Sequence, residues 1–179
     1  SISFVYSKAT KYIAALLLPL CFIAAALSAP LVEFIYGSQF LESAQVASVM
    51  LVAVAFGGTS SVQSAVVHGL NQTWFIVVAG SLGALLMVAV GFLVVPVWGL
   101  MGAAVGKATV QILMVTLGAL YAGSALNLDV PYKSLGKLII ASICGAVTST
   151  ILYSLHSEIL MLPVAALGGA AVFVAVGRL

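Results

Sequence analysis

Charged residues are scarce in this sequence, and their scarcity excludes an ordinary water-soluble fold. Of the 179 residues, only 6% are charged, whereas 64% are hydrophobic. Soluble domains are about 25% charged. So few charges cannot cover a fold in water, so we expect most of the surface to face lipid. The net charge of +2, without a basic cluster, gives no indication of a nucleic-acid partner.

Reactive motifs are also lacking. The sequence has two cysteines, Cys21 and Cys144, and each lies inside an apolar run without histidine or aspartate nearby. We interpret both as small buried apolar residues rather than metal ligands or catalytic thiols. No G-x-S-x-G, H-E-x-x-H, P-loop or C-x-x-C pattern occurs. We therefore predict no enzyme activity, no metal and no cofactor.

The sequence begins without a methionine or a cleavable signal pattern. It ends at Arg178 and Leu179, directly after an apolar run. From these two ends we expect a fragment of a longer membrane protein.

Long apolar runs are what the sequence has in abundance. A membrane-spanning helix needs about 20 mostly apolar residues, and barrel strands instead alternate over about 10. The runs are continuous, so residues 1–179 are predicted to form one all-α transmembrane region. The six predicted spans are 12–32, 44–70, 74–95, 100–122, 135–155 and 159–177. Pro19 should kink the first, and short connections predict an antiparallel up-down bundle of sequential neighbours.

The distribution of charge predicts the orientation of these spans. Lysine and arginine favour the cytoplasmic side. One predicted side carries five cations and Asp129; the cations are Lys8, Lys11, Lys133, Lys137 and Arg178. The other side has three acids and no cation; the acids are Glu33, Glu42 and Glu158. We therefore expect a multi-pass protein of the cytoplasmic membrane with both ends of the chain in the cytoplasm.

Lys107 is the one cation that this arrangement does not place near a membrane surface. It comes about seven residues into the fourth span, roughly 11 Å below the outer surface. A lysine near the bilayer centre costs about 2.5–3.5 kcal/mol. Gln111 lies one turn further along the same face. The pair either contacts an anionic group on a passing cargo, or Lys107 extends along its own helix toward the outer interface.

The second predicted span turns polar in its latter half. Ser60 and Ser64 are four residues apart on one face, and Gln63 lies one position away. Such residues can line a water-filled groove, or they can make interhelical hydrogen bonds worth about 0.6–2 kcal/mol each. Both interpretations remain open. Small residues four apart predict close helix contacts; these pairs are Gly80/Ala84, Gly102/Gly106, Gly118/Ala122 and Gly145/Ser149.

Three segments, taken in order, resemble polysaccharide and oligosaccharide flippases of the Wzx-like type. After Pro19, the run with Ile35, Tyr36, Gly37 and Phe40 resembles the family's outer loop, (I/L)YG-x-x-(F/Y). The segment Gly69–Trp74 resembles its cytoplasmic turn. VPVWGLMGAAVG resembles its (I/V)P-x-(W/Y)G-x-x-G-A-A turn, which carries Pro96, Gly99 and Gly102. The superfamily also contains MATE-type multidrug extruders and lipid II flippases.

This resemblance implies twelve to fourteen spanning helices in two lobes, of which the chain would supply the later ones. The implied cargo is a lipid-linked saccharide, usually bearing pyrophosphate, which crosses between the lobes by alternating access. The implied partners are this cargo, membrane lipids and an N-terminal lobe of the same protein that the chain lacks. Lys107 would then meet the phosphate of the cargo, although it matches no residue of the family pattern.

Two other functions stay open at the level of the sequence. A MATE-type cation antiporter would need membrane-embedded acids, and all four acids here fall in loops or at helix ends. A scaffold or assembly subunit without transport activity would leave Lys107 at the interface and use the serines as interhelical contacts. Close packing of the second and fourth spans, without a groove, would support the scaffold.

Overall fold

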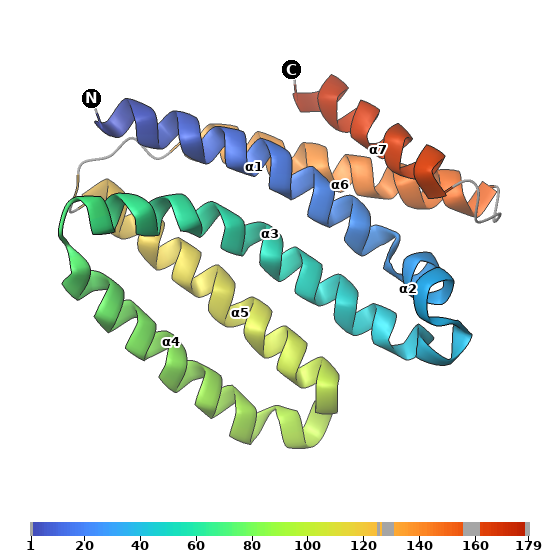
Figure 1. The fold of residues 1–179 in the computed structure, drawn as a ribbon, viewed down its shortest axis with the longest axis horizontal. Coiled ribbons are helices and arrows are strands. Elements are labelled where there is room, and N and C mark those ends of the chain that lie inside the picture. The colour runs from blue at the N-terminus through green and yellow to red at the C-terminus, as the bar shows by residue number, and fades with distance from the viewer. Residues whose placement is uncertain (1, 125, 127–130, 156–161, 178–179) are drawn as a thin grey trace.

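The computed structural model describes residues 2–124, 126, 131–155 and 162–177, and nearly all of them are helical (Figure 1). The elements are α1 (Ile2–Ala26), α2 (Ser28–Tyr36), the short 3-10 helix η1 (Ser38–Phe40), α3 (Leu41–Gly69), α4 (Thr73–Leu93), α5 (Val95–Ser124), α6 (Tyr132–Leu155) and α7 (Leu162–Gly177). Those ranges contain no strand. The predicted all-α class is confirmed.

Five stretches are long and apolar enough to cross a membrane, as expected of a multi-pass membrane protein. They are Ser3–Ala26, Ser38–Gly69, Thr73–Leu93, Val95–Ser124 and Tyr132–Ser154. The predicted sixth span corresponds to α7, of which 16 residues are described. Its first residues, 159–161, lie outside the described ranges, so the count of six stays a prediction.

The first helix differs most from its predicted bounds of 12–32. It begins at Ile2, because the segment before residue 12 has its own packing partners. Tyr6 and Thr10, one turn apart, are buried at 1% and 2% exposure. The Lys8 ammonium lies 4.4 Å from the centre of the Phe4 ring. These contacts stabilise a helical segment whose polar residues excluded it from the continuous apolar run that predicted the first span.

The interruption in this helix lies at Leu27 and not at Pro19. α1 continues through Pro19, whereas Leu27 leaves helical geometry and α2 starts at Ser28. Pro30 explains the position, because proline has no N–H to bond the carbonyl four residues earlier and its ring crowds that carbonyl. That carbonyl belongs to Ala26, the last residue of α1. In the first turn of α2 the same proline is tolerated.

The helices lie side by side in an order that differs from the order in the sequence. α3 packs between α1 and α5; α4 packs on the far side of α5, α6 packs on α1, and α7 packs on α6. The spatial order is therefore α4, α5, α3, α1, α6, α7 (Figure 1). The prediction of sequential neighbours was wrong for two connections, because α3 barely contacts α4 and α5 does not pack on α6. As a result, α3 and α5 are neighbours that run in the same direction, as do α1 and α6.

The core follows α1, whose buried residues face α3, α6 and α7. Ala14, Leu18 and Cys21 pack with Ala55 of α3, so Cys21 is buried as predicted. Cys144 is exposed, which corrects its interpretation as a buried residue. α6 buries small residues such as Ala141 and Ser142 instead.

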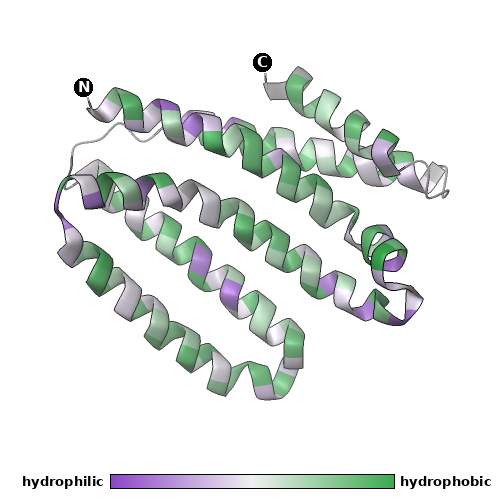
Figure 2. Cartoon of the chain, viewed as in Figure 1, coloured by the Kyte–Doolittle hydropathy of each residue, from purple (hydrophilic) through white to green (hydrophobic). Residues whose placement is uncertain are grey.

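Large apolar side chains cover the outside of the molecule. Figure 2 shows apolar colouring over most of each long helix. Gly83 is the buried residue of α4, while Leu85, Phe92 and Leu93 are 68%, 79% and 75% exposed. Such a surface would aggregate in water. It is the surface expected of helices surrounded by lipid tails.

The predicted pairs of small residues have mixed outcomes. Gly145 and Ser149 of α6 pack directly on Gly169 of α7, where a Cβ added to Gly145 would lie 2.7 Å from the Gly169 carbonyl oxygen. A Cβ on Gly106 would collide with Val90 of α4. Gly80, in contrast, has nothing within 4 Å of an added Cβ. Close helix contact is therefore confirmed at α6/α7 and α4/α5, and wrong at Gly80.

Candidate functional site

The seam between α3 and α5 holds all the polar residues that the sequence analysis selected. Two glutamines cross this seam in opposite directions, and each lies over a glycine of the other helix. Gln111 of α5 covers Gly57, where an added Cβ would lie 3.2 Å from Gln111 Nε2. Gln63 of α3 covers Gly118, and an added Cβ there would overlap Gln63 Oε1. The missing side chains of these glycines let two parallel helices approach closely.

Lys107 and Gln111 border a cavity of about 290 Å³ between α1, α3 and α5. The other lining residues are Leu17 of α1 and, from α3, Met50, Ala53, Val54, Gly57 and Gly58. Lys107 is exposed, and Gln111 is half-buried. Among the described residues, no acidic side chain lines this cavity. The cavity therefore joins one cation and one amide to walls of hydrocarbon and glycine.

Ser60, Gln63 and Ser64 border a second cavity of about 190 Å³ between α3, α4 and α5. Its other walls include Phe75 and Ile76 of α4 and Met114 of α5. The five selected residues are thus divided between two cavities. They do not converge on one polar site.

The hydroxyl and amide groups of α3 are partly occupied within the fold. Ser60 Oγ donates a hydrogen bond to the Gly57 carbonyl oxygen at 2.7 Å, within its own helix. Gln63 is only 8% exposed and packs on Gly118. Ser64 is exposed and faces the second cavity. Gln63 therefore contributes to the contact between helices, and Ser64 is the residue of this set most accessible from the cavity.

Two buried hydroxyl groups near Gln63 were missed by sequence reasoning. The Tyr6 hydroxyl lies near the side chains of Gln63 and Thr10. Within the part of the chain that the structure describes, neither Tyr6 Oη nor Thr10 Oγ1 has a hydrogen-bond partner in good geometry. The available signal was their four-residue spacing, which places both on one helical face. It was overlooked because the predicted helix started at residue 12.

Tyr36 and Gly37 form a turn that joins α2 to η1. Gly37 has a φ of 90° and a ψ of 166°, a region open almost only to glycine. Its N–H donates to the Glu33 carbonyl at 2.9 Å. The rings of Tyr36 and Phe40 meet edge to face, with centroids 6.1 Å apart. Tyr36, Gly37 and Phe40 thus shape the turn between α2 and α3.

Pro96, Gly99 and Gly102 shape the turn between α4 and α5. Pro96 lies in the first turn of α5, where a missing N–H is tolerated. Gly99 has a φ of 56° and a ψ of −137°, so one helical turn is separated from the rest of α5. A Cβ on Gly102 would lie 2.9 Å from the Val94 carbonyl oxygen. The tight turn expected here is therefore partly helical, and the straight part of α5 starts near the predicted residue 100.

Apart from Lys107, the described lysines and glutamates lie at opposite ends of the helix array. Lys8 and Lys11 lie early in α1, and Lys133 and Lys137 lie early in α6; both helix starts are at the same end of the molecule (Figure 1). Glu33 of α2 and Glu42 of α3 lie at the opposite end. The predicted asymmetry holds for these residues; Asp129, His156, Glu158 and Arg178 lie outside the described ranges.

Comparison with protein-family models, curated proteins and solved structures finds no match to this chain. Its function is therefore inferred from the three resembling segments and from the geometry of the α3/α5 seam.

Proposed function

We propose that the chain is part of a transporter that flips lipid-linked oligosaccharide or polysaccharide units across the cytoplasmic membrane. It would form part of one lobe of a two-lobed protein that works by alternating access, with both ends of this chain in the cytoplasm. Lys107 and Gln111 would contact the phosphate-bearing part of the cargo. The proposal rests on the resemblance to Wzx-like flippases together with one structural observation, the cation at the 290 Å³ cavity.

The position of Lys107 supports an anionic ligand. It lies about 10 Å along the helix from Leu100, where the straight part of α5 begins. A cation at such a depth is normally placed toward a cavity or an anion, because lipid cannot solvate it. No ion pair to Lys107 occurs among the described residues, and Gln111 adds N–H donors suited to phosphate oxygens. Lys107 and Gln111 together are therefore suited to bind an anionic group that arrives with the cargo.

Substitution of Lys107 in the complete protein tests this function. Lys107→Ala should lower translocation of the lipid-linked saccharide by at least tenfold, since a charged hydrogen bond contributes about 1.5–3 kcal/mol. Lys107→Arg should retain more activity than Lys107→Ala because it keeps the charge. Translocation is measured in membrane vesicles, with the amount of folded protein determined for each variant.

Lys133→Ala is the matched control, because Lys133 lies in the first turn of α6 at the end of the molecule. It should leave translocation unchanged. Normal translocation by Lys107→Ala at wild-type protein levels would refute the role of Lys107 in binding cargo.

A scaffold without transport activity is the second candidate, and one observation favours it. α3 and α5 pack closely along their length, with Gln63 and Gln111 each covering a glycine of the other helix. A scaffold needs such a seam, but it does not need the cavity at Lys107. Full saccharide export by cells that lack the protein would favour the scaffold over the flippase.

The MATE-type antiporter finds less support. Its cation would need an acid within the membrane, and the described acids, Glu33 and Glu42, lie on α2 and in the first turn of α3. The absent lobe would have to supply such acids.

A further inference from the structure

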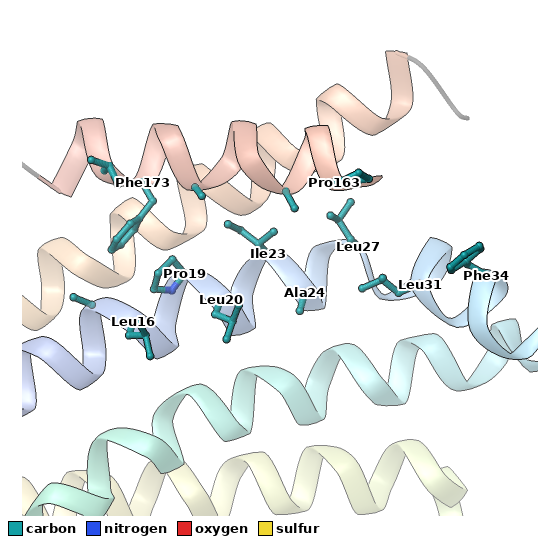
Figure 3. A pocket seen from close by; sticks show the side chains of 14 residues that line it. Leu16, Pro19, Leu20, Ile23, Ala24, Leu27, Leu31, Phe34, Pro163 and Phe173 are labelled. Carbon is teal, nitrogen blue, oxygen red and sulfur yellow. The ribbon is translucent and has the colours of Figure 1, made fainter. Parts of the chain in front are cut away.

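The outer surface of α1 carries a row of exposed side chains that changes from basic to apolar along the helix. The row consists of Phe4, Lys8, Tyr12, Leu16 and Leu20, each four residues and about one turn beyond the last. Leu16 and Leu20 also line an apolar groove between α1 and α7 (Figure 3). The row therefore has its charge near the start of α1 and hydrocarbon further along.

Lys11 adds a second cation beside Lys8. The two lysines are three residues apart and both are exposed, and residues at this spacing have Cβ atoms about 5–6 Å apart, so both ammonium groups can reach one anion. Two like charges this close destabilise a helix unless an anion lies between them. Neither lysine has an acidic partner among the described residues. The described acids, Glu33 and Glu42, lie at the opposite end of the molecule (Figure 1).

Lys8 and Lys11 lie at the depth where a membrane changes from hydrocarbon to headgroups. The apolar stretch Ser3–Ala26 has 24 residues and is about 36 Å long, which exceeds a hydrocarbon core of about 30 Å. Lys8 comes only about 8 Å after Ser3 along the helix.

The side chain of Lys8 extends toward the membrane surface. Helical side chains lean toward the N-terminus of their helix, and the Lys8 ammonium lies 4.4 Å from the centre of the Phe4 ring, one turn nearer that end. Its charge therefore lies within the first turns of the span, at the level of lipid phosphates.

We infer that Lys8 and Lys11 together bind the phosphate of one anionic phospholipid, in the leaflet at the N-terminal end of α1. The anion neutralises two neighbouring cations, and each ammonium supplies three N–H donors for its oxygens. A lipid with net negative charge is favoured over a zwitterionic one, because basic residues at a membrane surface attract anionic lipids. This site is separate from the cargo site, since Lys107 borders a different cavity, between α1, α3 and α5.

Lipid binding to the complete protein tests the inference. The purified protein is titrated in detergent with dioleoylphosphatidylglycerol or with dioleoylphosphatidylcholine, and the bound lipid is counted by native mass spectrometry. The double variant Lys8→Gln, Lys11→Gln should bind the first phosphatidylglycerol at least about tenfold more weakly than the wild type, since each lysine contributes about fivefold. Its binding of phosphatidylcholine should not change. Lys8→Arg with Lys11→Arg should retain the preference for phosphatidylglycerol because it keeps both charges.

Lys133→Gln is the matched control, because it removes the same charge at the same end of the molecule but from α6. It should change phosphatidylglycerol binding by less than about twofold. An equal loss in Lys133→Gln and in the α1 double variant would overturn the inference, since it would indicate a diffuse attraction to the whole end of the molecule. Wild-type phosphatidylglycerol binding by the double variant, with its helix content unchanged by circular dichroism, would overturn it as well.

Discussion

The ammonium group of Lys107 lies about two turns into the straight part of α5, where few polar side chains surround it. Gln111 is the only other polar side chain of its cavity among the described residues, and Gly57 and Gly58 expose backbone where side chains would otherwise fill the space. A lysine in such surroundings costs about 2.5–3.5 kcal/mol unless water or an anion reaches it. A 290 Å³ cavity has room for several waters at about 30 Å³ each. These surroundings leave Lys107 accessible both to water and to an anionic group that enters the cavity.

Tyr6 offers a direct measurement of an unpaired polar group in the fold. Its ring packs with Val62 and Ala122, while its hydroxyl lacks a well-formed hydrogen bond within the described residues. A buried unsatisfied hydroxyl costs about 1–3 kcal/mol. Tyr6→Phe keeps the ring, so it should raise the free energy of unfolding by up to about that amount. Unfolding in mixed detergent and dodecyl sulfate micelles, followed by circular dichroism, measures the change.

Tyr12→Phe is the control for this substitution, because Tyr12 is 70% exposed and its hydroxyl loses little solvation on folding. It should change the free energy of unfolding by less than Tyr6→Phe does. A lower stability of Tyr6→Phe would mean that the buried hydroxyl has a partner, such as a bound water.

At the scale of elements, the contact between α6 and α7 depends on backbone atoms that nearly touch. A Cβ at Gly145 would lie 2.7 Å from the Gly169 carbonyl oxygen and 3.6 Å from Phe173 Cβ. Neither helix backbone can yield without separating from the other. Gly145→Ala should therefore lower the free energy of unfolding by about 1–3 kcal/mol, the usual range for overpacking. The same micelle unfolding measurement applies.

Gly136→Ala, in the same helix, is the matched control. Nothing lies within 4 Å of an added Cβ at Gly136, so the higher helix propensity of alanine should leave stability equal or raise it by up to about 1 kcal/mol. Equal effects at the two glycines would contradict the role of the Gly145–Gly169 contact.

The glycine pairs also show how well the spacing of small residues predicts contacts between helices. The four-residue spacing located the contacts of Gly145 and Gly106, because small residues permit approach wherever two helices meet. The same spacing failed at Gly80, where Gly83, one turn on, makes the packed contact with Met114 instead. Spacing identifies a face that permits contact, but it does not say whether a neighbour is present there.

For the molecule as a whole, the charges at the two ends predict its orientation in the membrane. With Cys21 and Cys144 replaced by serine, Ser38→Cys should react with a membrane-impermeant maleimide added outside intact cells. Lys133→Cys should react only after the membrane is opened, because the cation-rich end belongs in the cytoplasm. Both positions are exposed, so accessibility in the fold does not limit labelling. Labelling of Lys133→Cys in intact cells would reverse the proposed orientation.

Much of the architecture could be predicted because membrane insertion depends on local composition. The runs that became α3, α4 and α6 were located within a few residues of their bounds, since about 20 apolar residues suffice to identify a span. Gly37 and Gly99 were selected at turns, and each adopts a positive φ. The start of α1 was missed because Tyr6 and Thr10 are stabilised by burial against other helices, which local hydropathy does not register.

The sequence by itself determined that this is a helical protein with several segments long and apolar enough to span a membrane, since lipid requires each apolar run to satisfy its own backbone hydrogen bonds. Only the tertiary structure decided which helices are neighbours. Helices that are apolar on all sides carry little information about which face packs. Local shape therefore determines which helices pack together: Gly57 lies beneath Gln111, Gly118 beneath Gln63, and Gly145 against Gly169. That choice placed α3 beside α5, put Lys107 and Ser64 on separate cavities, and left the groove between α1 and α7.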